Sequence, residues 1–317
     1  NLSNINIKNL GLFGTDCNNI SIYSGADLFV DDLTIEANGF VTLNRTTSTS
    51  VTYGTLFITS ADNITLDVTS NDLTLDSSTL SLSTDKNWLY IENASTLTLQ
   101  STSLSGNVNW SLTNLTIDAA SSIVADDLGD APGQGTGAGG AGTTFKGAGG
   151  GAFGGNGGSG SNDGWNSPSV QGGDAWDGII FPIEFGSGGG ICGHADCNDL
   201  DGRGGGIIYL TISDTFDFYG TMSSNGEMGG GRNSGAYPGG GASGGSIFIN
   251  TTNINATGNL SIEGGQGSDE QRCGGGGGGG RITIYYNTTP DTFSLTNIST
   301  VGGPIGCGDG SGQTAGD

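Results

Sequence analysis

The residues with the clearest capacity for chemistry lie in one short stretch, CGHADCNDLDG, at positions 192–202. Cys192 and Cys197 stand five residues apart, a spacing that favours a small disulfide loop. The stretch also carries hard oxygen ligands of the kind that Ca²⁺ prefers, in a spacing that fits no EF-hand. These ligands are Asp196, Asn198, Asp199 and Asp201. The pattern predicts a disulfide and no cofactor, with a structural calcium site beside the disulfide as the alternative.

A second metal site is the alternative for the same stretch, because His194, the only histidine of the chain, lies between the two cysteines. A structural zinc ion takes four firm N or S ligands, whereas Cys192, His194 and Cys197 supply three. The disulfide is therefore the preferred interpretation.

The other cysteines are Cys17, Cys273 and Cys307. Cys273 and Cys307 fall at equivalent positions of two glycine-rich units, so neighbouring coils would bring them within bonding distance. Cys17 is then left over, which predicts a free thiol or a bond to another chain.

Catalytic patterns are scarce. Parallel β-helix enzymes that cleave acidic polysaccharides combine Ca²⁺-binding acids with an Arg or Lys, but this chain has only 8 cationic residues against 31 acids. A net charge of −23 would also repel a polyanionic substrate. The alternative is a polysaccharide hydrolase with paired carboxylates, for which Asp67 and Asp76 are the candidates. We expect no enzyme activity.

The charge balance excludes other classes of partner as well. A nucleic-acid-binding protein needs a basic surface, and no basic cluster occurs. No apolar run approaches the roughly 18 residues of a membrane span, so we expect no membrane insertion. The sequence begins with Asn1 rather than Met, which predicts a mature product or a part of a longer chain.

Acceptor sites for N-linked glycans give the best indication of compartment. The pattern Asn-x-Ser/Thr occurs about twice as often as the composition gives by chance. The acceptors are Asn1, Asn19, Asn44, Asn63, Asn93, Asn109, Asn114, Asn250, Asn255, Asn259, Asn287 and Asn297. None lies between residues 129 and 249. The pattern predicts a secreted or cell-surface glycoprotein.

Residues 1–128 alternate apolar and polar residues, as in NITLDV (63–68) and TLTLQ (96–100), which is typical of strands with one buried face. Strand-like segments start at Ile20, Val41, Ile64, Leu89 and Trp110. A repeat of 20-odd residues with short strands favours a parallel β-helix, or β-solenoid. An antiparallel β-sandwich is the alternative for this N-terminal part.

Residues 129–317 form a second region, in which strands alternate with glycine-rich inserts. Strands restart near Ile207, Ile247 and Ile282. The expected inserts are roughly 129–160, 186–206, 225–245, 264–280 and 302–316, and the fourth contains seven consecutive glycines. Backbones without side chains can approach closely, so we expect the inserts to stack between coils and to hydrogen-bond in a polyproline-II-like conformation.

The pattern of residues 129–317, in which GGxIxI strands follow runs such as GGGGGGG, resembles glycine-rich β-helix repeats of large extracellular proteins of protists and plants. This resemblance implies a secreted or surface-exposed scaffold without catalytic residues.

Together these patterns predict an all-β structural glycoprotein that associates head to tail into an extracellular filament, because solenoid ends expose open strand edges. The alternative is a surface adhesin or carbohydrate-binding module, in which Trp165, Trp176 and Tyr237 stack on sugars. The second alternative is the polysaccharide-active enzyme considered above.

Overall fold

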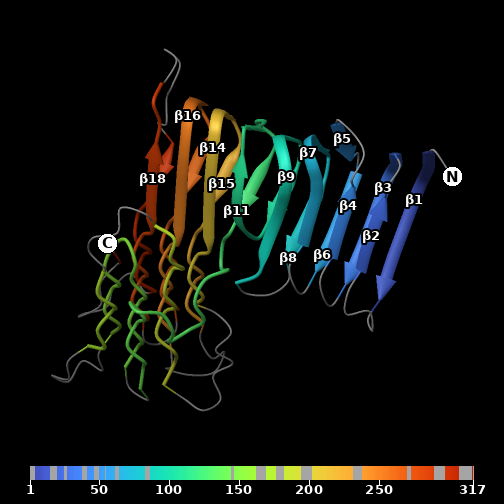
Figure 1. Ribbon diagram of the computed structural model, residues 1–317. Helices are drawn as coiled ribbons and strands as arrows, with labels where there is room; N and C mark the ends of the chain where they lie inside the picture. The colour runs from blue at the N-terminus through green and yellow to red at the C-terminus, as the bar shows by residue number, and fades with distance from the viewer. Residues whose placement is uncertain are drawn as a thin grey trace.

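The chain forms two stacks of parallel strands with a glycine-rich part beside them (Figure 1). The structure is a computed structural model. It describes residues 4–14, 20–24, 27–37, 41–45, 50–53, 55–60, 64–82, 86–143, 146–161, 169–175, 182–193, 202–230, 238–269, 273–288, 297–306 and 316. Every regular element in these residues is a β-strand, so the described chain is all-β.

Nine strands make the first sheet. In order across it they are β1 (Asn4–Gly14), β3 (Asp27–Ala37), β6 (Thr55–Ser60), β8 (Thr79–Leu82), β10 (Ser103–Ser105), β13 (Ser122–Val124), β15 (Thr221–Ser223), β17 (Asn259–Ser261) and β19 (Ile298–Ser299).

Ten strands make the second sheet. Its main path is β2 (Ile20–Ser24), β4 (Val41–Arg45), β7 (Ile64–Asp76), β9 (Trp88–Gln100), β11 (Asn107–Leu112), β14 (Ile207–Phe218), β16 (Ser246–Ala256) and β18 (Arg281–Tyr285). The short strand β5 (Ser50–Tyr53) pairs with β7, and β12 (Asn114–Ile117) pairs with β9 and β14. The chain visits the two sheets alternately, and we call each passage through both sheets a rung.

All pairings between these strands are parallel, and each strand pairs with its counterpart one rung away. The antiparallel sandwich considered for residues 1–128 is therefore wrong. Parallel neighbours cannot be joined by a tight hairpin. Tight hairpins usually carry Asn-Gly or Asp-Gly, and residues 1–128 contain only one such pair, Asn38-Gly39.

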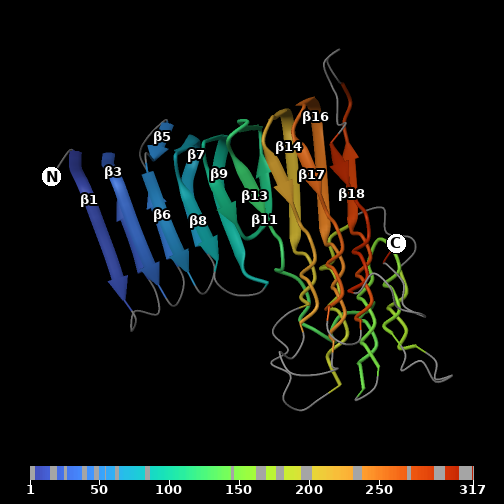
Figure 2. The ribbon, with the colours of Figure 1, turned by 180° about the vertical axis from the view of Figure 1, so that it is seen from behind.

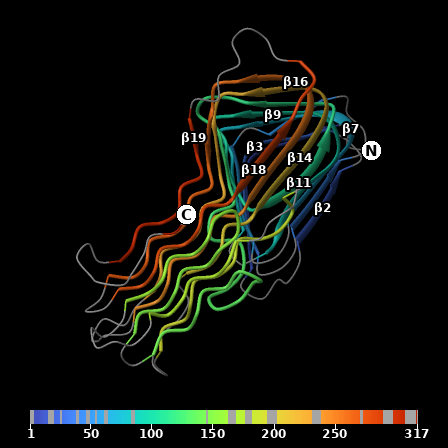
Figure 3. The same cartoon turned by 90° about the vertical axis from the view of Figure 1, so that its left-hand side faces the viewer.

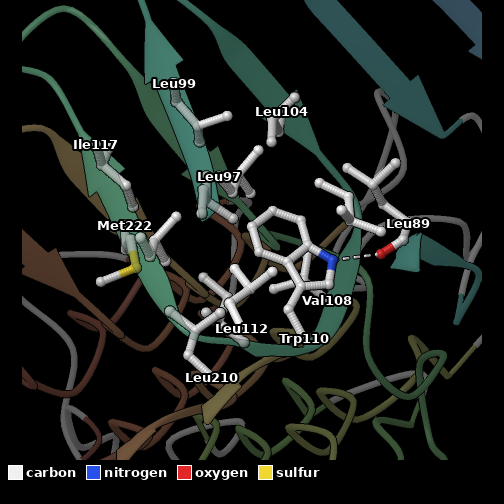
Figure 4. Packing of buried hydrophobic residues seen from close by; sticks show 14 of the residues in the cluster. Leu89, Leu97, Leu99, Leu104, Val108, Trp110, Leu112, Ile117, Leu210 and Met222 are labelled. Atoms are coloured by element: carbon white, nitrogen blue, oxygen red, sulfur yellow. Dashed lines mark hydrogen bonds between the residues drawn. The ribbon is translucent and has the colours of Figure 1, made fainter. Parts of the chain in front are cut away.

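The space between the sheets is filled by the alternating aliphatic residues. In β12 half-buried residues alternate with buried ones, and Leu115 and Ile117 are fully buried. Trp110 is the largest fully buried side chain among the described residues, and its Nε1–H donates to the Leu89 carbonyl oxygen at 2.9 Å (Figure 4). The indole is thus buried without an unsatisfied polar group.

The register confirms most of the expected repeat and corrects two positions. Ile20, Val41, Ile64 and Leu89 lie directly in register. The next member of this column is Val108 rather than Trp110, and in the later rungs Ile208 rather than Ile207 aligns with Ile247 and Ile282. Strand spacing varies from rung to rung, so the alternating pattern gives the start of a strand only to within one or two residues.

The glycine-rich segments lie together beside the later rungs, and we call them the glycine bundle (Figure 3). It consists of residues 129–142, 147–161, 170–173, 186–193, 202–206, 224–230, 238–245, 262–268, 273–280 and 301–306. Seen from behind, no segment of the bundle lies beside β1 to β8 (Figure 2). The predicted close packing and hydrogen bonding of the inserts are therefore present in the described residues.

Hydrogen bonds within the bundle repeat with a period of three residues. In the segment 239–245, donors turn in sequence toward three different neighbours. One neighbour accepts from every third residue: Gly239, Ala242 and Gly245 donate to residues 230, 227 and 224. A second neighbour accepts at residues 190 and 187 from Gly240 and Ser243. The third accepts at residues 275 and 278 from Gly241 and Gly244. An extended chain with three residues per turn and no internal hydrogen bonds is a polyproline II helix. The segment is such a helix, surrounded by three neighbours.

This arrangement explains the run of seven glycines at 274–280. A Cβ added to Gly274, Gly275, Gly276, Gly277, Gly278 or Gly280 would lie 1.9–2.3 Å from a backbone oxygen of another segment. Among the described glycines only Gly133, Gly135 and Gly202 have positive φ angles. The run is therefore glycine because backbone packs against it on every side.

The first two expected inserts are a single insertion, because no strand separates them in the described residues between β13 and β14. Its middle segment, 147–154, is hydrogen-bonded to the segments 238–245 and 273–280, which precede β16 and β18. Ala148 and Gly151 donate to residues 238 and 241, and they accept from Gly275 and Gly278. The insertion thus forms a second layer that joins rungs far apart in sequence.

The insertion between β13 and β14 begins and ends beside the same buried residue, Asn107. Asn107 accepts a hydrogen bond from the Ile207 N–H at 2.8 Å and donates to the carbonyl oxygens of Asn87 and Leu128 at 3.1 and 3.4 Å. Lys86 holds the same corner from outside, with its Nζ 2.5 Å from Asp130 Oδ1 and 5.0 Å from the centre of the Phe185 ring. These contacts fix the bundle against the sheets.

Candidate functional site

Among the side chains that the structure describes, those of the last rung form the most exposed part of the apolar core. Among the described residues, β18 and β19 each have a strand neighbour on one side only. Every residue of β18 is half-buried or exposed, whereas the inward residues of β16 are fully buried. An open edge of this kind presents unpaired backbone groups that can pair with another strand.

Columns of aliphatic residues run through the rungs and end at this edge. In the first sheet one column is unbroken over eight pairings and consists of Leu12, Ile35, Ile58, Leu80, Leu104, Ile123, Met222, Leu260 and Ile298. Leu260 is 1% exposed, but Ile298 is 43% exposed. Covering Ile298 would contribute roughly 1 kcal/mol, about half of the gain from burying a whole isoleucine.

The second sheet ends in the same way. Ile247 and Ile249 are buried, whereas Ile282 and Ile284, which follow them in register, are only partly buried. Val301, just after β19, is 60% exposed. The rung therefore offers an apolar patch between two open strand edges, and we call it the terminal patch (Ile282, Ile284, Ile298 and Val301).

The opposite edge of both sheets is formed by β1 and β2. Ile5, Ile7, Leu10 and Leu12 of β1 are in register with Leu28, Val30, Leu33 and Ile35 of β3. The aliphatic columns thus extend from one edge of the described sheets to the other. Since all strands are parallel, a strand added at either edge by translation along the stack would run in the required direction.

The chain matches none of the protein-family models, curated proteins or solved structures with which it was compared.

Seven of the twelve predicted glycan acceptors have described side chains, and all seven lie in or next to the sheets. Five are exposed: Asn109, Asn250, Asn259, Asn287 and Asn297. Asn114 and Asn255 are half-buried and hydrogen-bonded to the neighbouring rung, through Thr215 N–H and Asp217 Oδ1 respectively. Asn44 and Asn93 lie within β4 and β9, and Asn1, Asn19 and Asn63 lie outside the described residues.

Two of the five cysteines are described, and both are disulfide-bonded: Cys192 and Cys273. The predicted partners Cys197 and Cys307 lie outside the described residues, as does Cys17. The Gly306 N–H donates to the Gly274 carbonyl oxygen, so the chain neighbours of Cys307 and Cys273 are in contact. This contact is consistent with the predicted Cys273–Cys307 pair.

The remaining predicted sites fall into two groups. The calcium ligands Asp196, Asn198, Asp199 and Asp201, His194, and the aromatic residues Trp165, Trp176 and Tyr237 lie outside the described residues. Asp67 and Asp76 lie on either side of the register shift in β7, in register with Glu92 and Gln100, so the fold does not bring them together as a carboxylate pair. In the described part of the chain, no three His, Cys, Asp or Glu residues gather to hold a metal ion, and no helix is long and apolar enough to cross a membrane.

Sequence reasoning missed a polar ladder where the rungs enter the bundle. Asn225 N–H donates to Asp126 Oδ1 at 2.7 Å, and Asn225 Oδ1 accepts from Ser261 Oγ and Glu263 N–H at 2.7 Å each. Beside it, burial raises the pKa of Asp127 to about 7, and the charges of Glu227 and Asp126 act in the same direction. Asp126 and Asp127 are thus parts of a structured corner, and only the register of the rungs identifies their partners.

Proposed function

We propose that the chain is a secreted, glycosylated β-solenoid that serves as a structural subunit of an extracellular filament or surface appendage and associates head to tail. The observation that carries this proposal is the terminal patch. Two parallel sheets reach the same edge together, and the aliphatic columns end there half-covered. The partner is a second copy, whose first strands would supply the next members of the columns.

Other observations support a secreted scaffold. Disulfides at Cys192 and Cys273 suit an oxidising compartment. The exposed acceptors lie on the sheets, where glycans would project into solvent. Much of the rest of the chain builds a backbone-packed bundle, which contributes rigidity and few reactive groups. The stacking of glycine-rich inserts between solenoid coils is part of the same proposal.

Electron microscopy of the native secreted material tests the proposal. We expect fibres with a regular axial repeat. Dispersed single particles would contradict it, and glycan-array binding would then test the adhesin alternative.

A charge placed in the terminal patch tests the joint itself. We expect Ile298→Asp to abolish fibres while leaving a folded monomer, because the carboxylate would be buried without a partner. Thr113→Asp is the matched control, since it adds the same charge at an exposed position between β11 and β12, remote from the terminal patch. Equal loss of fibres in both variants would show that net charge, and not the patch, governs assembly.

Cys17 is the candidate for a covalent link between subunits. Cys17→Ser should leave the monomer folded and remove any dimer seen on non-reducing gels. A wild-type protein that runs only as a monomer would exclude the link.

A further inference from the structure

Three aromatic rings follow one another on the outer face of the second sheet. Tyr209 and Phe248 are in register on β14 and β16, and their rings stack at 4.5 Å with an interplanar angle of 7°. The ring of Tyr285 on β18 follows at 5.9 Å from Phe248, tilted by 55°. We call these three residues the aromatic strip. Phe248 is buried within it, Tyr209 is half-buried, and Tyr285 is 38% exposed.

Two predicted glycan acceptors lie directly beside this strip. Asn109 on β11 is in register with Tyr209, and Asn250 on β16 is in register with Tyr285. Both asparagines are exposed and belong to the same outer face as the rings, since the residues on either side of Asn109, Val108 and Trp110, are buried. Asn250 also follows Phe248 by two positions on the same strand, so the two residues share a face.

We propose that Asn109 and Asn250 carry N-linked glycans whose first sugars pack on the aromatic strip and form part of the folded structure. The inference rests on the glycosylation included in the proposed function, and it adds a role for two particular sites. An adjacent parallel strand lies about 4.8 Å away, so a sugar attached to either asparagine starts beside a ring on the next strand.

The chemistry favours this contact. The C–H-bearing face of N-acetylglucosamine is weakly apolar and slightly positive, and the face of an aromatic ring is negative. Packing the two faces removes apolar surface of Tyr209 and Tyr285 from water. The glycan hydroxyls remain at the surface, where water can hydrate them. The sugars that would pack on the accessible parts of Tyr209 and Tyr285 are therefore attached to the chain itself.

The matched control is Asn259, an exposed acceptor without aromatic neighbours in register. On the preceding rung Asn259 is in register with Thr221 of β15. On the following rung Leu260 pairs with Ile298, which places Asn297 beside Asn259. In protein secreted from a glycosylating host, we expect Asn250→Gln and Asn109→Gln each to lower the melting temperature by about 2–4 °C. Asn259→Gln should change it by less than about 1 °C.

Enzymatic trimming separates the first sugar from the rest of the glycan. An endoglycosidase that leaves one N-acetylglucosamine on each asparagine should preserve the melting temperature of the wild type, because the packed sugar remains. If trimming lowers the melting temperature of the wild type as much as Asn250→Gln does, the proposal is overturned. Equal effects of Asn250→Gln and Asn259→Gln on the melting temperature would also overturn it.

Glycopeptide mass spectrometry supplies the other decisive result. Unmodified Asn109 and Asn250 in native material would overturn the inference, whether or not fibres form. Fibres seen by electron microscopy would still support the proposed assembly, so failure of the glycan sites and failure of the filament are distinguishable.

Discussion

Replacing Gly277 by alanine tests whether the glycine bundle is a packed core or a set of flexible loops. A Cβ at this position would lie 1.9 Å from the Ala242 carbonyl oxygen and 2.3 Å from its carbon. Real Cβ contacts essentially never fall below 3.0 Å, so the segments 238–245 and 273–280 would have to separate by about 1 Å. No rotamer change can relieve this clash, because both partners are backbone.

The cost follows from the contacts that such a separation breaks. Two hydrogen bonds join these segments: Gly241 N–H donates to Gly275 O at 2.9 Å, and Gly244 N–H donates to Gly278 O at 3.0 Å. Each such bond contributes about 0.5–1.5 kcal/mol net, and overpacking a tight core costs about 1–3 kcal/mol. We therefore expect Gly277→Ala to lower the free energy of unfolding by about 3–5 kcal/mol. In a flexible segment with negative φ the same change would raise it by about 0.4–1 kcal/mol.

The two interpretations thus predict opposite signs for the change in the free energy of unfolding. Denaturant unfolding gives the stability, and hydrogen exchange with peptide resolution shows where it is lost. Gly277→Ala should deprotect the segments 262–268 and 273–280 while residues 107–117 keep their protection. Ala242→Gly is the matched control, since it removes a methyl group that the bundle accommodates and should cost only about 1–2 kcal/mol. A variant Gly277→Ala that is as stable as the wild type would refute the packed bundle.

Three further predictions concern the junction of sheets and bundle. Asn107→Ala should lower the free energy of unfolding by about 3 kcal/mol, because it leaves buried backbone groups of Ile207 and Leu128 without partners. Asn107→Asp should not recover this loss at neutral pH in denaturant titrations, because its carboxylate accepts from Ile207 N–H but faces two carbonyl oxygens without a donor. The folded chain keeps the Asp127 proton up to about pH 7, whereas an unfolded aspartate releases it near its usual pKa of 3.8. Stability should therefore fall as pH rises through this window and level off above it, and Asp127→Asn should stabilise the protein at pH 8 but scarcely at pH 4, as measured by unfolding at both pH values. Reduction of the disulfide at Cys273 should speed hydrogen exchange in residues 262–280 and leave the sheets unchanged.

Much of the fold could be predicted from the sequence, because period-two alternation fixes which residues face the core. Ile64, Leu66, Leu73 and Leu75 of β7 are all fully buried, as their alternation requires. Alternation does not fix which strands pair. The parallel arrangement was preferred from the repeat length and the scarcity of hairpin-turn sequences. The column was misplaced at Trp110 because the rung that ends there is shorter than the preceding ones.

The contacts within the bundle could not be predicted. Glycine runs predict close approach, but all glycines are alike, so nothing in the sequence states that Gly151 accepts from Gly278 or that Gly150 donates to Gly158. The same limit applies to the terminal patch and the aromatic strip. Ile298 and Tyr285 are ordinary strand residues until the register shows that the column of Ile298 ends there and that Tyr285 stands beside Asn250.

The bundle also changes how the stack of rungs bears load. In a simple solenoid each rung contacts only its neighbours, so stability is a sum of nearest-neighbour terms and one rung can detach alone. Here the segment 147–154 is hydrogen-bonded to the inserts that precede β16 and β18. Detaching either rung therefore breaks backbone hydrogen bonds to the first insertion as well as the aliphatic columns. A subunit pulled along its stacking axis, as a filament joined through the terminal patch would pull it, resists through both sets of contacts at once.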